Sequence, residues 1–455
     1  MLVSSETGQK SVVRIRPGLR FKGEAEARIE SLSHDLCGVA HIDGKAVFIE
    51  GALPGELVRY GITRRKPSFD KGIALEILEA SKERVMEPRC EHFGICGGCA
   101  LQHLTDESQV KHKQIIVEDN FNKIGSVSPE QWLKPIVGPS WAYRRKARLG
   151  VRLVPSKGGV LVGFRERNNS YITNVTHCHV LDERIAALLP ALRKLIGGLS
   201  CPDRIPQVEV AAGDSGATFV FRHLVALTKE DRQALQQFER QHRIEVLLQP
   251  GGPDSIQALE GSASLLEYAL PEFDIDIRFR ATDFTQVNIE VNRKMIHRAI
   301  ELLDLNENDR VLDLFSGLGN FTLPIAKRCS RVLGIEGDDS LVKGAQNNAT
   351  HNGVNNAYFE KGDLYQQNDT APWGEYSFNK LMIDPPRSGA SEVINHLTTG
   401  SAPEKIVYVS CYPSTLARDS AHLVHNLGYR LKSACVMDMF PQTSHVESMA
   451  LFIRD

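Results

Sequence analysis

Residues 310–320 read RVLDLFSGLGN, an apolar run that passes directly into a turn with two glycines. Glycines let the backbone turn tightly and bring its N–H groups close to a ligand. The next apolar run ends at Glu336, whose carboxylate can accept hydrogen bonds from both hydroxyls of a ribose. The glycine spacing is shorter than the pattern that binds pyrophosphate, which favours a nucleoside cofactor such as S-adenosylmethionine over NAD. Asp363 follows the third run, where it could meet the adenine. The alternative is a tight turn flanked by surface acids.

Strand and helix patterns alternate outward from this turn through the C-terminal part of the chain. The expected strands are 310–314, 332–336, 357–361, 380–383 and 405–410, and the expected helices are 291–303, one ending at 327, and 339–351. A hairpin of 429–439 and 448–453 closes the pattern. This order predicts a doubly wound, Rossmann-like α/β fold with a parallel sheet that binds ligands at the carboxyl ends of its strands.

The earlier part of the chain follows other patterns. Five short β-like runs between turn signals predict a small OB-like barrel, a fold that often binds RNA; they are 24–29, 38–42, 45–49, 56–62 and 72–78. A Cys- and Gly-rich stretch, a helix at 105–124 and a mostly β region with a helix near 182–196 follow. We therefore expect three domains, namely a barrel at 12–80, a central α+β domain at 81–279 and the doubly wound domain at 280–455.

The charge of the chain is close to balanced but unevenly distributed. The 54 basic and 56 acidic side chains give a formal net charge of −2, which argues against a simple polybasic nucleic-acid binder. Residues 81–180, however, carry a net charge of +6, against −4 over 181–280 and −5 over 281–455. Most of the basic excess lies between Arg144 and Arg167. This stripe is either a phosphate-binding surface for RNA or a solvated strand edge.

Neither a membrane span nor a signal peptide is expected. No stretch approaches the ~18 apolar residues that a membrane helix needs, and Met1 to Lys10 is polar. We expect a cytoplasmic monomer that does not bind membranes. Nine cysteines, an odd number, argue against a disulfide scaffold in such a protein.

Two further motifs follow strand ends of the doubly wound part. The prolines of Asp384-Pro-Pro-Arg387 stiffen a turn that would line the ligand cleft. Cys411 lies just beyond the next strand, and 438–447 supplies a possible base before the last one. A lone cysteine in an α/β core more often packs than reacts.

Beside a methyl-donor pocket, a thiolate and a carboxylate suit one difficult reaction, the methylation of carbon 5 of uracil. Carbon 5 is a poor nucleophile. Addition of the thiolate to carbon 6 creates an enolate that can attack a methyl sulfonium. A base must then remove the proton from carbon 5 so that the thiolate can leave.

Three clustered cysteines, Cys90, Cys96 and Cys99, indicate a metal or cluster site because thiolates suit zinc and iron–sulfur clusters. A fourth ligand is needed, and Cys178 is the best candidate since it also lies in the basic region. Zinc, an iron–sulfur cluster and unrelated free thiols all remain open on the residues alone.

In combination these motifs resemble the bacterial RNA uracil-C5-methyltransferases, in particular the type that acts on uracil 1939 of 23S ribosomal RNA. The resemblance covers nearly the whole chain: a TRAM-like barrel, the four cysteines and the C-terminal core. The matching core motifs are Phe284-Thr-Gln286-Val-Asn288, Asp313 to Asn320, Asp384 to Arg387, Ser410 to Pro413 and His445-Val-Glu447.

The resemblance implies a role for each of these residues. Cys411 would be the nucleophile and Glu447 the base that removes the proton from carbon 5. The residues that would contact S-adenosylmethionine or line its pocket are Gln286, Phe315, Asn320, Glu336, Asp363 and Asp384. The ligands of a [4Fe-4S] cluster with a structural or RNA-binding role would be Cys90, Cys96, Cys99 and Cys178. The implied partner is 23S ribosomal RNA, single-stranded or unfolded around the target uridine.

Three alternatives compete with this interpretation. Related enzymes that methylate a uridine of transfer RNA or of another ribosomal site share the core. A non-catalytic RNA-binding assembly factor could retain the cofactor fold, although it would not need both Cys411 and Glu447. A zinc-containing methyltransferase of a small molecule is the third.

Overall fold

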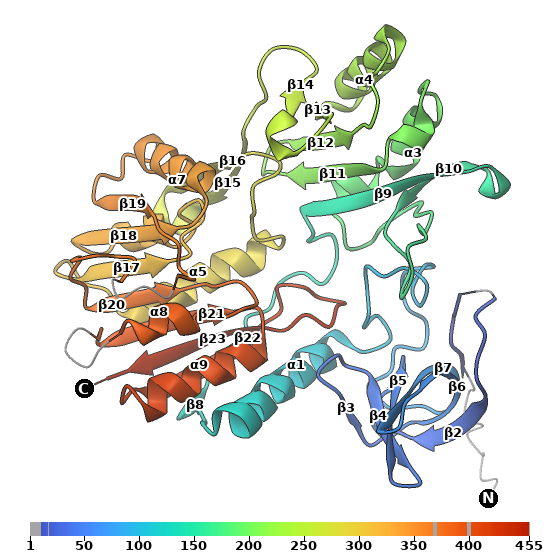
Figure 1. Cartoon of the computed structure of the whole chain (residues 1–455), viewed down its shortest axis with the longest axis horizontal. Helices are drawn as coiled ribbons and strands as arrows, with labels where there is room; N and C mark the ends of the chain where they lie inside the picture. The colour runs from blue at the N-terminus through green and yellow to red at the C-terminus, as the bar shows by residue number, and fades with distance from the viewer. Residues whose placement is uncertain (1–10, 17, 367–370, 398–401, 455) are drawn as a thin grey trace, which may run out of the picture.

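The computed structural model describes residues 11–16, 18–366, 371–397 and 402–454. Met1 to Lys10, on which the expected lack of a signal peptide rests, lies outside the described residues. Figure 1 shows three large sheets: an eight-stranded sheet at the left, a six-stranded one at the upper right and a seven-stranded one at the lower right. No helix in the described part of the chain is long and apolar enough to cross a membrane.

The eight-stranded sheet is built mostly from the C-terminal part of the chain. Its order is β19 (Ala357–Lys361), β18 (Arg331–Glu336), β17 (Arg310–Leu314), β20 (Lys380–Ile383), β21 (Lys405–Ser410), β23 (Glu447–Ile453), β22 (Arg430–Met437) and β8 (Gln131–Trp132). The first five strands are parallel. The expected closing hairpin is present, but β23 lies between β21 and β22 and is antiparallel to both.

Helices cover both faces of this sheet, which confirms the doubly wound, Rossmann-like fold. One apolar layer includes Met295 of α5 (Ile289–Leu303), Ile325 of α6 (Thr322–Ala326) and Ala345 of α7 (Asp339–His351). The opposite layer includes Val393 of α8 (Ser391–Asn395) and Leu416 of α9 (Pro413–His425).

Part of the expected central domain lies on this C-terminal sheet. Helix α1 (Asp106–Asn120), followed by a π-helical turn at Phe121–Gly125, places Val117 and Phe121 in the same apolar layer as Leu416. Strand β8 extends the sheet by pairing in parallel with β22. The helix expected at 105–124 is therefore present and covers one face of the sheet beside α9 (Figure 1).

The N-terminal sheet confirms the small all-β fold expected there. Its strands are β1 (Ser11–Val12), β2 (Glu24–Arg28), β3 (Ser31–Leu32), β4 (Gly38–Ile42), β5 (Lys45–Glu50), β6 (Leu57–Arg65) and β7 (Phe69–Glu79). Their order is β2-β6-β7-β5-β4-β3, with β1 paired to β7. The short strands β1 and β3 carry no clear pattern in the sequence and were not expected.

The central sheet runs β10 (Gly159–Gly163), β9 (Lys146–Val154), β11 (Gln207–Ala212), β12 (Ala217–Arg222), β13 (Glu245–Gln249) and β14 (Gln257–Ala258). Helix α4 (Lys229–His242) packs on it through Leu235 and Phe238. The single helix expected near 182–196 is two helices, α2 (Glu183–Ala186) and α3 (Leu189–Gly197), because Pro190 stands in the first turn of α3. A separate hairpin, β15 (Leu266–Leu270) with β16 (Ile275–Phe279), joins the apolar layer of α5.

Candidate active site and cysteine cavity

The glycine turn after β17 presents its backbone to open space. Gly317 has a φ of 53°, in the left-handed region that favours glycine, and a Cβ at this position would meet no atom within 4 Å. The carboxylate of Glu336, at the end of β18, accepts hydrogen bonds from the N–H groups of Gly317 (3.1 Å) and Asp338 (3.0 Å). Glu336 is thus fixed beside the turn, as a ribose-binding carboxylate needs to be.

Buried polar atoms without partners lie under the same turn. Asp313, 1% exposed, accepts a hydrogen bond from the Thr322 hydroxyl with one oxygen, while its Oδ1 has no partner among the described residues. The Ser316 hydroxyl also lacks one. Burial raises the pKa of Asp313 to about 7. Unpaired buried groups are costly, so their presence here fits a pocket whose ligand completes their hydrogen bonds.

Two other predicted cofactor residues are positioned by neighbours. The side chain of Asn320 accepts hydrogen bonds from Tyr268 (2.8 Å) and Asn292 (3.0 Å) and donates one to Asn292 (2.9 Å). Phe315 has a φ of 65°, and its ring lies 5.8 Å from that of Tyr365 between centroids.

The remaining predicted residues are fixed less tightly. Gln286 is half-buried in the segment before α5, and Asp363 is exposed after β19, where it accepts a hydrogen bond from the N–H of Tyr365 at 3.0 Å. Asp384 follows β20, and burial raises its pKa to about 7.

Cys411 and Glu447 come together through the insertion of β23. Ser410 of β21 pairs with Ser448 of β23, so Cys411 and Glu447 occupy the next positions along two adjacent strands. Burial raises the pKa of the Cys411 thiol to about 12, and the carboxylates of Glu447 and Asp384 add to this. Burial likewise raises the pKa of Glu447 well above its usual value.

Two cations offset the negative charge around Glu447. Lys113 and Arg387 both act to lower the pKa of Glu447. Arg387 also lies 3.0 Å from His445, between Nη2 and Nδ1. Burial lowers the pKa of His445, with Arg387 as the next cause, so the neutral ring is favoured.

Lys113 was missed in the sequence because a lysine in a helix normally faces solvent. Here it is fully buried, and its ammonium donates to Asp438 at 2.7 Å and to the carbonyl of Phe440 at 3.1 Å. The loop between β22 and β23, which ends at Glu447, is therefore anchored to helix α1. The only sequence signal was a lysine in a helix whose neighbours Ile116 and Val117 are apolar.

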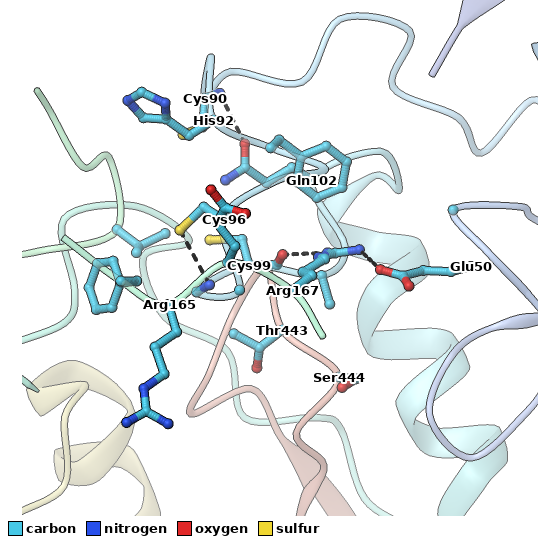
Figure 2. Close-up of a pocket in the computed structure, with 18 of the residues that line it drawn as sticks. Glu50, Cys90, His92, Cys96, Cys99, Gln102, Arg165, Arg167, Thr443 and Ser444 are labelled. Carbon is cyan, nitrogen blue, oxygen red and sulfur yellow. Dashed lines mark hydrogen bonds and ion pairs between the residues drawn. The ribbon is translucent and has the colours of Figure 1, made fainter. Parts of the chain in front are cut away.

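All four predicted cysteine ligands line one cavity of about 750 Å³. Figure 2 shows Cys90, Cys96 and Cys99 turned toward this space. The N–H of Cys90 donates to Gln102 Oε1 at 3.0 Å, and the N–H of Gly98 donates to Cys96 Sγ at 3.4 Å. Burial raises the pKa of Cys96 to about 11 and that of Cys99 to about 12.

The cavity is bordered by the N-terminal part of the chain, the Cys-rich stretch, the central region and the loop before β23. Arg167 contacts Glu50 of the N-terminal sheet, donates to the carbonyl of Cys99 and lies over the ring of Phe93. Thr443 and Ser444, which Figure 2 labels, and the next residue, His445, belong to the loop before β23 and also line the cavity. In the described ranges no three or more His, Cys, Asp or Glu side chains are grouped to hold a single metal ion.

The cations of the basic stripe between Arg144 and Arg167 include a group held in ion pairs and a group of exposed side chains. Arg145 is paired with Asp214, Arg148 with Glu209 and Arg167 with Glu50. Exposed Arg152, Lys157 and Arg165 form no ion pair within the part of the chain that the structure describes. In Figure 2 the Arg165 guanidinium points away from the cysteines.

Models of two known families match parts of the chain. A model of the tRNA (uracil-5-)-methyltransferase family matches residues 179–455, and a model of the TRAM domain matches residues 23–75. The chain belongs to the tRNA (uracil-5-)-methyltransferase family.

Curated relatives of this uracil methyltransferase match over nearly their whole length. It is 50% identical over 431 residues, 94% of this chain and 99% of the relative, to 23S rRNA (uracil(1939)-C(5))-methyltransferase RlmD of Aromatoleum aromaticum. It is also 47% identical to the protein of the same name from Legionella pneumophila, over 442 residues that cover 96% of this chain and 99% of the relative.

A solved structure supports the fold of the uracil methyltransferase. The tRNA (uracil-54, C5)-methyltransferase of Pyrococcus abyssi, in complex with S-adenosyl-L-homocysteine, superposes with a TM-score of 0.71 at 22% identity, covering 94% of this chain and 100% of the other.

Proposed function

We propose that this protein transfers a methyl group from S-adenosylmethionine to carbon 5 of a uridine in 23S ribosomal RNA, the one that corresponds to uracil 1939. The observation that carries the chemistry is the placement of Cys411 beside Glu447 at the carboxyl edge of the sheet. The RlmD proteins at 47–50% identity support the choice of RNA and of the position.

Cys411 and Glu447 act in sequence on the base. The Cys411 thiolate adds to carbon 6 of the uracil and forms an Sγ–C6 bond, which makes carbon 5 nucleophilic. Carbon 5 would then take the methyl group from the sulfonium of S-adenosylmethionine, whose S–CH3 bond would break to leave S-adenosylhomocysteine. Glu447 then removes the proton from carbon 5, the Sγ–C6 bond breaks, and the 5,6 double bond is restored. Burial raises the pKa of Glu447 well above its usual value, and the nearby cations Lys113 and Arg387 oppose this shift and so act toward the ionised form that the proton removal requires.

The cofactor pocket lies next to this pair. Glu336 is held by the N–H groups of Gly317 and Asp338 and would bind the ribose. The unpartnered Oδ1 of Asp313 and the open face of Gly317 fit a bound polar ligand. We assign Gln286, Phe315, Asn320, Asp363 and Asp384 to the rest of this pocket.

We further propose that Cys90, Cys96, Cys99 and Cys178 hold a [4Fe-4S] cluster. Zinc would need four sulfur atoms about 2.3 Å from one ion, whereas each cysteine of a four-iron cluster binds a different iron, so the sulfur atoms lie further apart. Four thiols from two segments of the chain line one cavity of about 750 Å³, and such a donor set fits a cluster held by four cysteines. Elemental analysis of anaerobically purified protein should give about four iron and four sulfide per chain. Zinc without iron or sulfide would contradict the cluster.

Mapping of methylated uridines by mass spectrometry, in ribosomal and transfer RNA with and without the gene, tests the substrate. The expected result is loss of one methyl group from 23S RNA that the wild-type gene restores and a Cys411→Ala gene does not. A second candidate, a uridine of transfer RNA, is favoured by the description of the matching family model. Loss confined to transfer RNA would support it and contradict the ribosomal assignment.

A further inference from the structure

The loop between β22 and β23, which carries His445 and leads directly into Glu447, contains one residue in a strained conformation, Gln442. Its φ of 67° lies in the left-handed region that residues other than glycine rarely adopt, and it is 1% exposed. Such a conformation persists only where surrounding contacts over-determine it.

Two distant segments of the chain supply these contacts. From helix α1, Gln109 Nε2 donates to Gln442 Oε1 at 3.0 Å, and Gln109 Oε1 accepts from the Gln442 N–H at 2.9 Å. Gln442 Nε2 donates to Asp106 at 2.8 Å. From the other side, the N–H groups of Ala100 and Leu101 donate to the Gln442 carbonyl at 2.7 and 3.0 Å.

These contacts connect the cysteine cavity to the proposed base. Ala100 directly follows Cys99 in the chain. On the other side of Gln442, Thr443 to His445 line the same cavity, and Glu447 comes two residues later. A shift of the Cys-rich stretch would therefore pull on the Gln442 carbonyl and move the segment that ends at Glu447.

We propose that Gln442 is a positioning residue, which aligns Glu447 with carbon 5 of the uracil and makes this alignment depend on the conformation of the Cys-rich stretch. The proposal rests on the proposed function. Since Glu447 acts only after methyl transfer, loss of the Gln442 side chain should slow release of the RNA from Cys411 far more than it slows methyl transfer.

A single-turnover experiment with the full-length protein separates the two steps. A labelled methyl group reports transfer, and the covalent protein–RNA band on a denaturing gel reports release. For Gln442→Ala we expect transfer within about threefold of the wild-type rate and release slowed about tenfold or more, because misplacing a general base forfeits part of its 10²–10⁴-fold contribution. The matched control is Gln114→Ala on the same helix, whose side chain donates a hydrogen bond to Glu118 and none to the loop before β23 among the described residues.

Gln109→Ala tests the same contact from the helix if Gln442→Ala does not fold. Equal slowing of both steps, or release at the wild-type rate in a folded variant, would overturn the proposal. Glu447→Gln serves as the reference: if it does not accumulate the adduct, the assignment of the base itself fails. If Glu447→Gln accumulates the adduct but Gln442→Ala and Gln109→Ala do not, only the role of Gln442 fails.

Hydrogen exchange can test, without an activity assay, whether the position of the segment before Glu447 depends on the Cys-rich stretch. In Cys99→Ser, amide hydrogen exchange of 438–447 should become faster than in the wild type, because the hydrogen bonds from Ala100 and Leu101 loosen. Unchanged exchange in this segment would show that the cysteine stretch does not control the loop.

Discussion

Cys411 and Glu447 meet across the pairing of β21 with β23, and burial together with the Glu447 carboxylate raises the pKa of the Cys411 thiol to about 12. The thiolate, not the thiol, is the nucleophile. The free protein therefore holds its nucleophile in the unreactive form. A positive charge in the pocket would oppose the Glu447 and Asp384 carboxylates and favour the thiolate.

Alkylation of Cys411 should consequently respond to the charge of a bound cofactor analogue. At pH 8, we expect slow alkylation of Cys411 in the free protein, and faster alkylation with a methyl-donor analogue that carries an amine than with neutral-sulfur S-adenosylhomocysteine. The two analogues share the adenosine and amino-acid parts, so the comparison is chosen to vary the charge near the thiol. Mass spectrometry of the Cys411 peptide measures the rate, and equal rates with the two analogues would refute the electrostatic argument.

Cys411→Ala should lower methyl transfer at least about 10³-fold, since covalent activation of carbon 5 is lost. It should also abolish the covalent adduct with RNA that contains 5-fluorouridine. Denaturing gels and methyl incorporation measure both. Cys435→Ala, a buried cysteine of β22 that packs in the core, is the control and should keep both activities. Turnover by Cys411→Ala would remove the cysteine from the mechanism.

Glu447→Gln should behave differently from Cys411→Ala. The amide cannot take the proton from carbon 5, so methyl transfer proceeds while the RNA stays attached to Cys411, with release slowed about 10²–10⁴-fold. The measurement is the fraction of methylated RNA found in the covalent band. Normal release would mean that another group removes the proton.

The exposed cations of the basic stripe should control RNA affinity. Replacement of Arg152, Lys157 and Arg165 by glutamine should lower the slope of log Kd against log salt by about two, since each phosphate contact to a single strand contributes about 0.7. Arg148→Gln is the control because Arg148 is already paired with Glu209. An unchanged slope in the triple variant would place the RNA elsewhere.

The buried pair of Lys113 and Asp438 should matter for stability. Lys113→Met leaves the Asp438 carboxylate buried without its cation, a change that costs about 3–5 kcal/mol. Lys111→Met, which breaks an exposed pair with Glu83, should cost under about 1 kcal/mol. Urea unfolding measures both, and similar losses for the two variants would show that burial of Lys113 is unimportant.

The elements that the sequence predicted well are those decided by neighbouring residues. Helix α7 begins and ends where expected because Asp338 caps it, accepting hydrogen bonds from the N–H groups of Ser340 and Leu341. Strand β17 is a short, mostly apolar run that ends at a glycine turn, and Glu336 and Cys411 could be identified as candidates because they stand at or just beyond strand ends.

The residues that escaped prediction depend on contacts between distant segments. Strand β8 is two residues long and exists only through its pairing with β22. Gln442 and Lys113 are polar residues that look like surface positions. Their burial follows from the packing of α1 against the C-terminal sheet, which no local pattern reports. The assigned roles of the site residues and the three domain bounds remain predictions.

The pairing of Gln131 and Trp132 with Ser433 and Ala434 also has a consequence for biosynthesis. During translation, α1 and β8 leave the ribosome long before the strand that completes their sheet. The barrel can close early, but the Cys-rich stretch and the base acquire their final positions only after nearly the whole chain has emerged. A prematurely terminated product would therefore contain the N-terminal barrel but lack Glu447 and the strand that places it beside Cys411, so the site would be incomplete.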